Sequence, residues 1–194
     1  MPSLTMPVLH AGPVVLRAFE EGDTPLIQSV ANDPLIPLIT TVPTTGTTTD
    51  ALAYISRQHD RLSSGAGYSF AIAAADTGEA VGQIGLWLQD ISAGRASIGY
   101  WIASHHRRRG LLGPALSTLA QWAWAIEDLH RIEAYVEPWN VPSWRAVEGC
   151  GFQREGLLRS WQEVGDQRKD MYVYSLIRED SQASREHERQ DSAE

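Results

Sequence analysis

The chain has 194 residues, 43% of them hydrophobic and 21% charged, which is ordinary for a globular protein, and no apolar run reaches the length of a membrane span. Its formal net charge of −8 argues against broad nucleic-acid binding, because non-specific affinity requires many phosphates to be neutralised. One cysteine, Cys150, excludes an internal disulfide.

The first part of the chain predicts one strand and two helices. Residues 14–17 form a short β-branched run that is typical of a strand. Helix-start residues precede apolar residues at helical spacing between Thr24 and Asp33, and again over 50–62, so a helix is expected in each place. The segment 34–49 is rich in proline and threonine and lacks either period, which predicts a loop.

The middle of the chain predicts three consecutive antiparallel strands at 68–72, 80–87 and 95–102. Apolar residues at helical spacing over 114–126 then predict a helix, with a proline in its first turn. A further strand is expected at 131–136. The strand-helix-strand order implies a parallel crossover between the last two strands.

The last part predicts a short helix at 144–150 and a closing strand pair at 152–163 and 168–177. Residues 179–194 are charged and polar without aromatics, which indicates a disordered tail. We therefore expect a single α+β domain over residues 1–178, with a mixed, mostly antiparallel sheet of about seven strands flanked by helices.

A basic, glycine-containing stretch joins the strand at 95–102 to the following helix, and it reads His105-His106-Arg107-Arg108-Arg109-Gly110-Leu111-Leu112-Gly113. Free N–H groups at a helix start, close approach at glycine and the positive end of the helix dipole favour a bound phosphate there. Arginine side chains can hold the same oxygens. The stretch predicts an anion site, and a solvated basic turn is the alternative. The two histidines have no partner at metal spacing, so no metal site is expected.

Two motifs resemble those of a known family. Arg107-x-x-Gly110-x-Leu112 resembles the acyl-CoA pyrophosphate loop of the GNAT N-acetyltransferases, Gln/Arg-x-x-Gly-x-Gly/Ala, although Leu112 departs from its last position. The segment from Asn140 to Arg159 resembles the Asn-x-x-Ser and Gly-Phe-x-x-Glu-Gly-x-x-Arg signature of the branch that contains the Rim-type ribosomal-protein N-terminal acetyltransferases. The two motifs occur in the family's order, and the resemblance covers roughly residues 12 to 178.

The resemblance implies a GNAT-like fold in which the fourth and fifth strands splay apart and the pantetheine arm of acetyl-CoA lies in the gap. It implies acetyl-CoA contacts at Ile102, Ala103, Arg107, Arg108, Arg109, Gly110, Leu111, Leu112, Gly113, Asn140 and Ser143. Ser143 is also the best candidate to protonate the departing thiolate, and its alternative role is only to cap the helix.

The general base is less well defined. Relatives often carry Glu in the fourth strand, where this chain has Ser97. Glu163 lies near the place of an acceptor-side glutamate in Rim-type enzymes, although a shift of one residue would put Gln162 there. Glu133 and Glu137 are further candidates. For each of these carboxylates, a solvated surface group is the favoured interpretation over a catalytic one.

The resemblance implies an acetyl-CoA-dependent N-acetyltransferase in which a primary amine attacks the thioester directly, in a ternary complex. Making an α-amine neutral at pH 7 costs roughly 1 kcal/mol, against about 4.6 kcal/mol for a lysine, so an N-terminal amine needs only a weak base. The acceptor is left open between a protein N-terminus and a small amine. A non-catalytic acyl-CoA-binding sensor is the alternative function.

The same interpretation implies a cytoplasmic protein with no nucleic-acid or membrane partner. Residues 1–11 have neither the basic start nor the apolar run of a secretory signal. The identity of the acyl group is open, with succinyl-CoA as another candidate donor, and a homodimer is also left open.

Overall fold

The computed structural model describes residues 5–179. Its helices and strands are β1 Leu9–Ala11, β2 Val14–Arg17, α1 Thr24–Val30, α2 Ile36–Ile39, α3 Thr48–Ser63, β3 Gly67–Ala74, β4 Ala80–Trp87, β5 Arg95–Ile102, α4 Leu112–Ala123, β6 Arg131–Val136, α5 Val141–Gly149, β7 Gln153–Val164 and β8 Gln167–Ile177.

The strands form one eight-stranded sheet in the order β1-β2-β3-β4-β5-β6-β8-β7. All neighbouring strands are antiparallel except β5 and β6, which are parallel and are joined through α4. The predicted α+β class, the mostly antiparallel sheet and the parallel crossover are therefore confirmed. The one described strand that the sequence does not predict is β1. Its three residues are too few to show the alternation of apolar and polar residues that indicates a strand.

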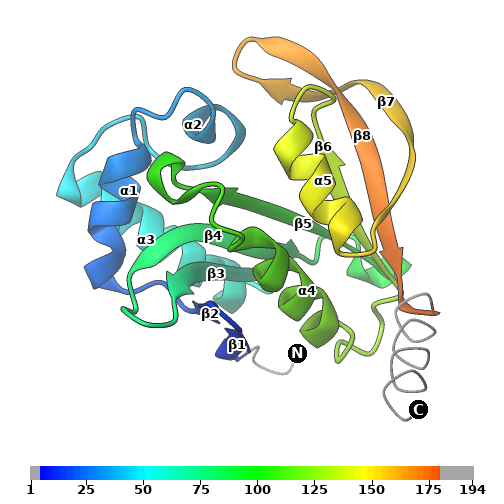
Figure 1. Cartoon of the computed structure of the whole chain (residues 1–194), viewed down its shortest axis with the longest axis horizontal. Coiled ribbons are helices and arrows are strands. Elements are labelled where there is room, and N and C mark those ends of the chain that lie inside the picture. The colour runs from blue at the N-terminus through cyan, green and yellow to red at the C-terminus, as the bar shows by residue number, and fades with distance from the viewer. Residues whose placement is uncertain (1–4, 180–194) are drawn as a thin grey trace.

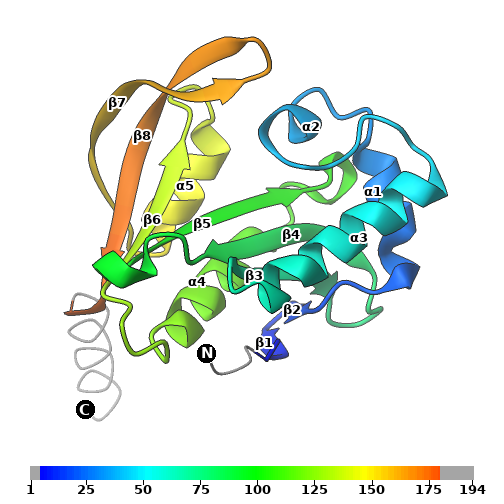
Figure 2. The same cartoon turned by 180° about the vertical axis from the view of Figure 1, so that it is seen from behind.

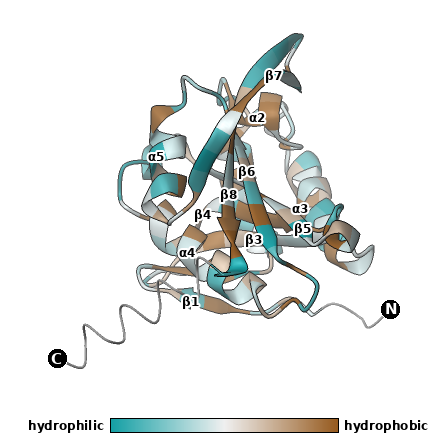
Figure 3. Ribbon diagram, turned by 90° about the vertical axis from the view of Figure 1, so that its right-hand side faces the viewer, coloured by the Kyte–Doolittle hydropathy of each residue, from teal (hydrophilic) through white to brown (hydrophobic). Residues whose placement is uncertain are grey.

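Helices cover both faces of the sheet (Figures 1 and 2). The helices α4 and α5 lie on one face, and α3 lies on the other with α1 beside it. Leu116 and Leu119 of α4 are fully buried against the first face, and Ile27 and Tyr54 pack in a second cluster on the α1–α3 side. Figure 3 shows hydrophilic residues along much of β7, at the edge of the sheet.

The segment 34–49 is not entirely the loop that its composition predicts, because Ile36–Ile39 forms the short helix α2. The Asp33 carboxylate starts this helix, since its Oδ1 accepts hydrogen bonds from the N–H groups of Leu35 and Ile36, both at 3.0 Å. Ile36 is buried. A helix of four residues is too short to show a period, so the pattern could not predict it.

Two predictions concern the ends of the chain. The predicted tail at 179–194 lies, apart from Glu179, outside the described residues, and the domain boundary at residue 178 stays a prediction. Among the described helices, none combines the length and apolar character needed to cross a membrane.

Candidate active site

The strands β5 and β6 pair along only part of their length. Their ladder runs from Arg95 opposite Arg131 to Ile98 opposite Ala134, whereas β5 continues to Ile102 and β6 to Val136. A cleft of about 580 Å³ opens where the strands part. The residues of β5 and β6 that line it are Ser97, Ile98, Gly99, Tyr100, Trp101, Ala134, Tyr135 and Val136. Backbone polar groups beyond the ladder need partners, so the gap suits a ligand that can hydrogen bond to them.

The start of α5 and the strand β5 place two hydroxyl groups side by side at the gap, those of Ser143 and Tyr100. Asn140 caps the helix, because its side chain accepts a hydrogen bond from the Ser143 N–H at 3.4 Å. The Ser143 Oγ lies 2.8 Å from the Tyr100 hydroxyl, which also donates to the Ser143 carbonyl at 3.2 Å. Burial raises the pKa of Tyr100 to about 12, so its phenol is protonated at neutral pH. Asn140 and Ser143 both line the cleft, and their contact with acetyl-CoA stays a prediction.

The predicted phosphate loop lies between β5 and α4. Arg108 and Gly110 have φ angles of 62° and 72°, in the left-handed region that glycine adopts without strain. The N-cap residue of α4 is Leu111, which provides no side-chain cap. Within residues 5–179, no side chain accepts a hydrogen bond from the first N–H groups of this helix, which lie at the positive end of its dipole. This is the chemistry of an anion site.

The three arginines of the loop have different surroundings. Arg107 donates from Nε to the Ile102 carbonyl at 2.8 Å and from a terminal nitrogen to the Asp33 carboxylate at 2.9 Å, so its guanidinium group is already engaged by the protein. Arg108 and Arg109 are exposed, and neither makes an ion pair with another described residue. Of the three side chains, these two are available to an anion.

The end of β5 offers fewer free groups than the resemblance implies. The Ala103 N–H donates to the Val81 carbonyl at 3.0 Å, and the Ile102 carbonyl accepts from Arg107. Contacts of these two residues with a ligand stay a prediction.

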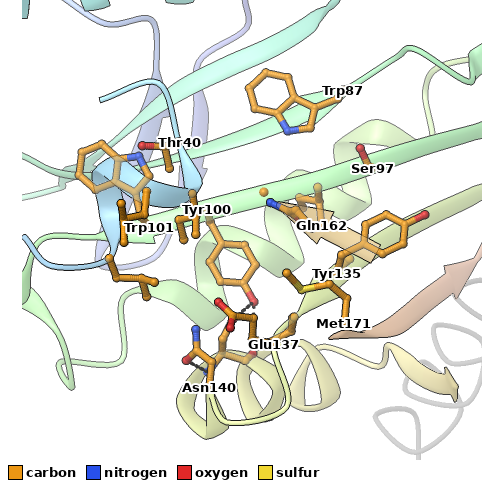
Figure 4. Close-up of a pocket in the computed structure, with 18 of the residues that line it drawn as sticks. Thr40, Trp87, Ser97, Tyr100, Trp101, Tyr135, Glu137, Asn140, Gln162 and Met171 are labelled. Carbon is orange, nitrogen blue, oxygen red and sulfur yellow. Dashed lines mark hydrogen bonds between the residues drawn. The ribbon is translucent and has the colours of Figure 1, made fainter. Parts of the chain in front are cut away.

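The face of the sheet covered by α3 forms the opposite side of the cleft, and an indole group makes its floor. Trp87 lies across two glycines: a Cβ atom on Gly85 would come within 2.4 Å of the Trp87 ring, and one on Gly99 within 3.2 Å of its Nε1. The Arg61 guanidinium group stacks over the same ring, 4.4 Å from its centroid. Figure 4 shows Trp87 on the same side of the cleft as Ser97. Sequence reasoning missed Trp87 and Arg61 as lining residues.

A buried polar network fixes the neighbouring part of the floor. The Gln83 Oε1 accepts hydrogen bonds from the Trp101 Nε1 at 2.7 Å and the Tyr54 hydroxyl at 3.1 Å. Its Nε2 donates to the Ser69 Oγ at 2.8 Å and to the Gln58 Oε1 at 3.4 Å. Gln83 and Trp101 both line the cleft, and their hydrogen bonds hold them in one arrangement. Gln83, a polar residue within the otherwise apolar segment 80–87, was the available sequence signal.

Two carboxylates line the cleft, Glu137 and Glu163. Glu163 is exposed, and the adjacent Gln162 is half-buried and directed into the cleft (Figure 4). Glu137 is half-buried, and its Oε2 accepts a hydrogen bond from the Trp139 Nε1 at 2.7 Å.

Glu133 does not line the cleft, and its carboxylate is engaged by Arg131 and by the Tyr135 hydroxyl, both at 2.7 Å. Although burial opposes the change, these hydrogen bonds lower the pKa of Glu133, so it is a poor base.

An irregularity in β7 sets which of its residues face the cleft. The β7–β8 register shifts between Leu158 and Gln162, and Ser160 has a φ of 53° with its N–H donating to the Asp170 carboxylate at 2.7 Å. Trp161 then stacks on the Tyr135 ring, with a centroid separation of 5.5 Å. Because a bulge breaks the alternation of faces, the orientation of Glu163 could not be predicted by counting along the strand.

Comparisons with known proteins agree with this geometry. The family model described as an acetyltransferase (GNAT) domain matches residues 14–153. The chain is 30% identical over 173 residues to the uncharacterized N-acetyltransferase p20 of Bacillus licheniformis, covering 89% of this chain and 97% of that protein.

Solved structures with the same fold include enzymes of the predicted branch. Mycobacterium smegmatis RimJ in complex with CoA-disulfide is 28% identical, with a TM-score of 0.76 over 90% of this chain and 87% of that one. A putative ribosomal-protein-serine acetyltransferase from Vibrio cholerae is 23% identical, with a TM-score of 0.73 over 88% and 97% of the two chains. The resemblance seen in the two motifs is confirmed. The chain belongs to the acetyltransferase (GNAT) family of enzymes.

Proposed function

We propose that this protein transfers an acetyl group from acetyl-CoA to a primary amine, by direct attack of the amine on the thioester in a ternary complex. The observation that carries the proposal is the parting of β5 from β6 beyond Ile98 and Ala134, with a cleft between them that is lined from both faces of the sheet. A donor on the α4–α5 side and an acceptor on the α3 side can meet in such a gap, where orientation contributes much of the rate.

The residues present suit acetyl-CoA as the donor. The uncapped start of α4 and the exposed Arg108 and Arg109 suit its phosphates, and the capped start of α5 puts Asn140 and Ser143 beside the gap. We propose that the hydroxyl groups of Ser143 and Tyr100 stabilise the departing thiolate, because two hydroxyl groups 2.8 Å apart can both interact with one developing negative charge.

For the base we propose a carboxylate of the cleft, Glu163 or Glu137. Glu137 directly follows β6 and is less exposed than Glu163, so it has the stronger interaction with an approaching ammonium group. The test is the pH profile of Glu137→Gln and Glu163→Gln. Loss of the base should lower the rate on an N-terminal amine about tenfold at pH 7 and much less at pH 9, where the amine is already neutral. A deficit that does not change with pH would exclude a base role for that residue.

The function itself is tested by measuring thiol release from acetyl-CoA with two acceptor panels, peptides with free N-termini and small amines. We expect turnover with peptides, because an α-amine demands less of a base than an alkylamine. Calorimetric titration with acetyl-CoA runs in parallel. Tight binding without turnover of any amine would instead support the non-catalytic sensor, and failure of the folded protein to bind any acyl-CoA would reject the proposal.

A further inference from the structure

The acceptor side of the cleft contains an arginine without a charged partner. Arg61 is half-buried, lies over the Trp87 ring and donates to the Thr41 Oγ1 at 3.4 Å. No carboxylate of residues 5–179 lies within ion-pair distance of it. The half-buried Arg17 and Arg131 differ in this respect, since Asp23 lies 2.8 Å from the first and Glu133 lies 2.7 Å from the second.

An unpaired, half-buried guanidinium group is unfavourable without compensation. Desolvation lowers the pKa of Arg61, which indicates that its charged form has lost hydration that no anion replaces. The stack on Trp87 recovers part of the cost, but a guanidinium group has five N–H donors and the hydrogen bond to Thr41 uses one. An anion entering the cleft would meet free donors in a planar fork that suits a carboxylate.

The charges around the cleft are segregated. Glu137 follows β6 and Glu163 belongs to β7, so both carboxylates lie on one wall. Among the described residues that line the cleft, Arg61 is the only lysine or arginine, and it belongs to α3 on the other side. An acceptor with an ammonium group at one point and an anionic group at another would therefore find a complementary charge for each.

The position of Arg61 limits how far the anion lies from the amine. The Trp87 ring beneath it lies over Gly85 and Gly99. Tyr100, the next residue of β5, faces the other side of the sheet, where its hydroxyl meets Ser143. The guanidinium group and the hydroxyl pair are therefore separated by the sheet and by side chains on each of its faces, roughly 10 Å. A carboxylate on the carbon that bears the amine stays next to the amine. A side chain on the second or third residue of an extended peptide reaches this distance.

We propose that Arg61 selects acceptor peptides that carry aspartate or glutamate at the second or third position. This inference rests on the proposed function and narrows its acceptor class. A small aminoalkanoic acid of similar length also carries a carboxylate at a distance from its amine, so it offers Arg61 the same chemistry. The experiment distinguishes the peptide from this small acceptor.

The experiment compares peptide pairs that are identical except for Asp or Asn at position two, or at position three, with aminoalkanoic acids of graded length as a separate arm. In one of the two pairs we expect the KM of the Asp peptide to be roughly 10 to 100 times lower than that of the Asn peptide. This is the gain in affinity that a hydrogen-bonded charge pair provides. The kcat should be similar, because the contact is the same in the ground and transition states.

Variants of α3 assign the effect to one side chain. Arg61→Gln should abolish the preference for the acidic peptide, and Arg61→Glu should reverse it in favour of a peptide with lysine at the same position. The matched control is Arg57→Gln, because Arg57 belongs to the same helix and contacts the Thr41 carbonyl but does not line the cleft. It should leave the preference unchanged.

The inference is overturned if the unaltered enzyme treats Asp and Asn peptides alike, if Arg61→Gln weakens both equally, or if only aminoalkanoic acids respond to Arg61. Calorimetric binding of the same peptides to the protein saturated with acetyl-CoA keeps the two proposals distinct. A retained preference in binding without turnover would reject the proposed function alone, whereas turnover without any preference would reject only the role of Arg61.

Discussion

Replacing Ser143 by alanine tests the chemistry of the gap most directly. The Ser143 and Tyr100 hydroxyl groups lie 2.8 Å apart, and the pKa of Tyr100 is about 12. A thiol has a reference pKa of about 8.5, roughly 3.5 pKa units below that of Tyr100. Complete transfer of the phenol proton to the thiolate would therefore cost roughly 5 kcal/mol of free energy. The pair is therefore expected to stabilise the departing thiolate by hydrogen bonding, without complete proton transfer.

The size of the effect follows from that distinction. A hydrogen bond to a charged group contributes about 1.5–3 kcal/mol, so Ser143→Ala should lower kcat roughly 10- to 150-fold. The affinity for acetyl-CoA should change little, because the charge exists only as the thioester breaks. Tyr100→Phe should give a similar loss, and the double variant should lose much less than the product of the two, because the hydroxyls act as a unit.

The assay is thiol release at saturating acetyl-CoA, with dissociation constants from calorimetry. Ser143→Thr, which keeps the hydroxyl, should retain most of the activity, and Ser117→Ala in α4 serves as a remote control. An unchanged kcat for Ser143→Ala, or a loss confined to acetyl-CoA binding, would refute the assignment of the hydroxyl pair to the leaving group.

Three further predictions concern the donor loop, the buried network and the pH dependence of stability. The combined change Arg108→Ala and Gly110→Trp should abolish the heat of acetyl-CoA binding measured by calorimetry, while the far-UV circular dichroism spectrum stays unaltered. Undiminished binding would show that acetyl-CoA does not bind at this loop. Gln83→Leu leaves two buried donors unpaired and should cost about 2–6 kcal/mol in free energy of unfolding by urea titration; a cost below about 1 kcal/mol would show that the network is unimportant. Hydrogen bonds from Arg131 lower the pKa of Glu155 to about 2, below its unfolded value, so Glu155 stabilises the fold above about pH 4.5 and that stabilisation is lost as the pH falls toward 2. Glu155→Gln should flatten the dependence of unfolding free energy on pH in this window, and parallel curves would contradict the assignment.

The sequence predicts the regular part of this fold well because each long element has a clear period. The strand expected at 131–136 coincides with β6, and the helix expected over 50–62 lies within α3. The short elements are different. Nothing in a four-residue segment predicts α2, which depends on hydrogen bonds from its first N–H groups to Asp33.

The site is predictable where one local motif supplies both residue and geometry. Asn140 and Ser143 belong to one helix start, so their spacing fixes their relation. Arg107 is the opposite case, because its partner Asp33 is 74 residues away and no local pattern indicates that ion pair. Likewise, the importance of Arg61 emerges only when α3 packs over Trp87.

The Asp33 carboxylate has a further consequence, because one side chain serves two segments. One of its oxygens starts α2, which lines the acceptor side, and the other binds Arg107 at the edge of the donor loop. The carboxylate is only 6% exposed, so it has little freedom to release one contact and keep the other. A ligand that displaces Arg107 therefore also acts on α2. Linkage would then require a ligand at the loop and a ligand beside α2 to change each other's affinity by the same factor.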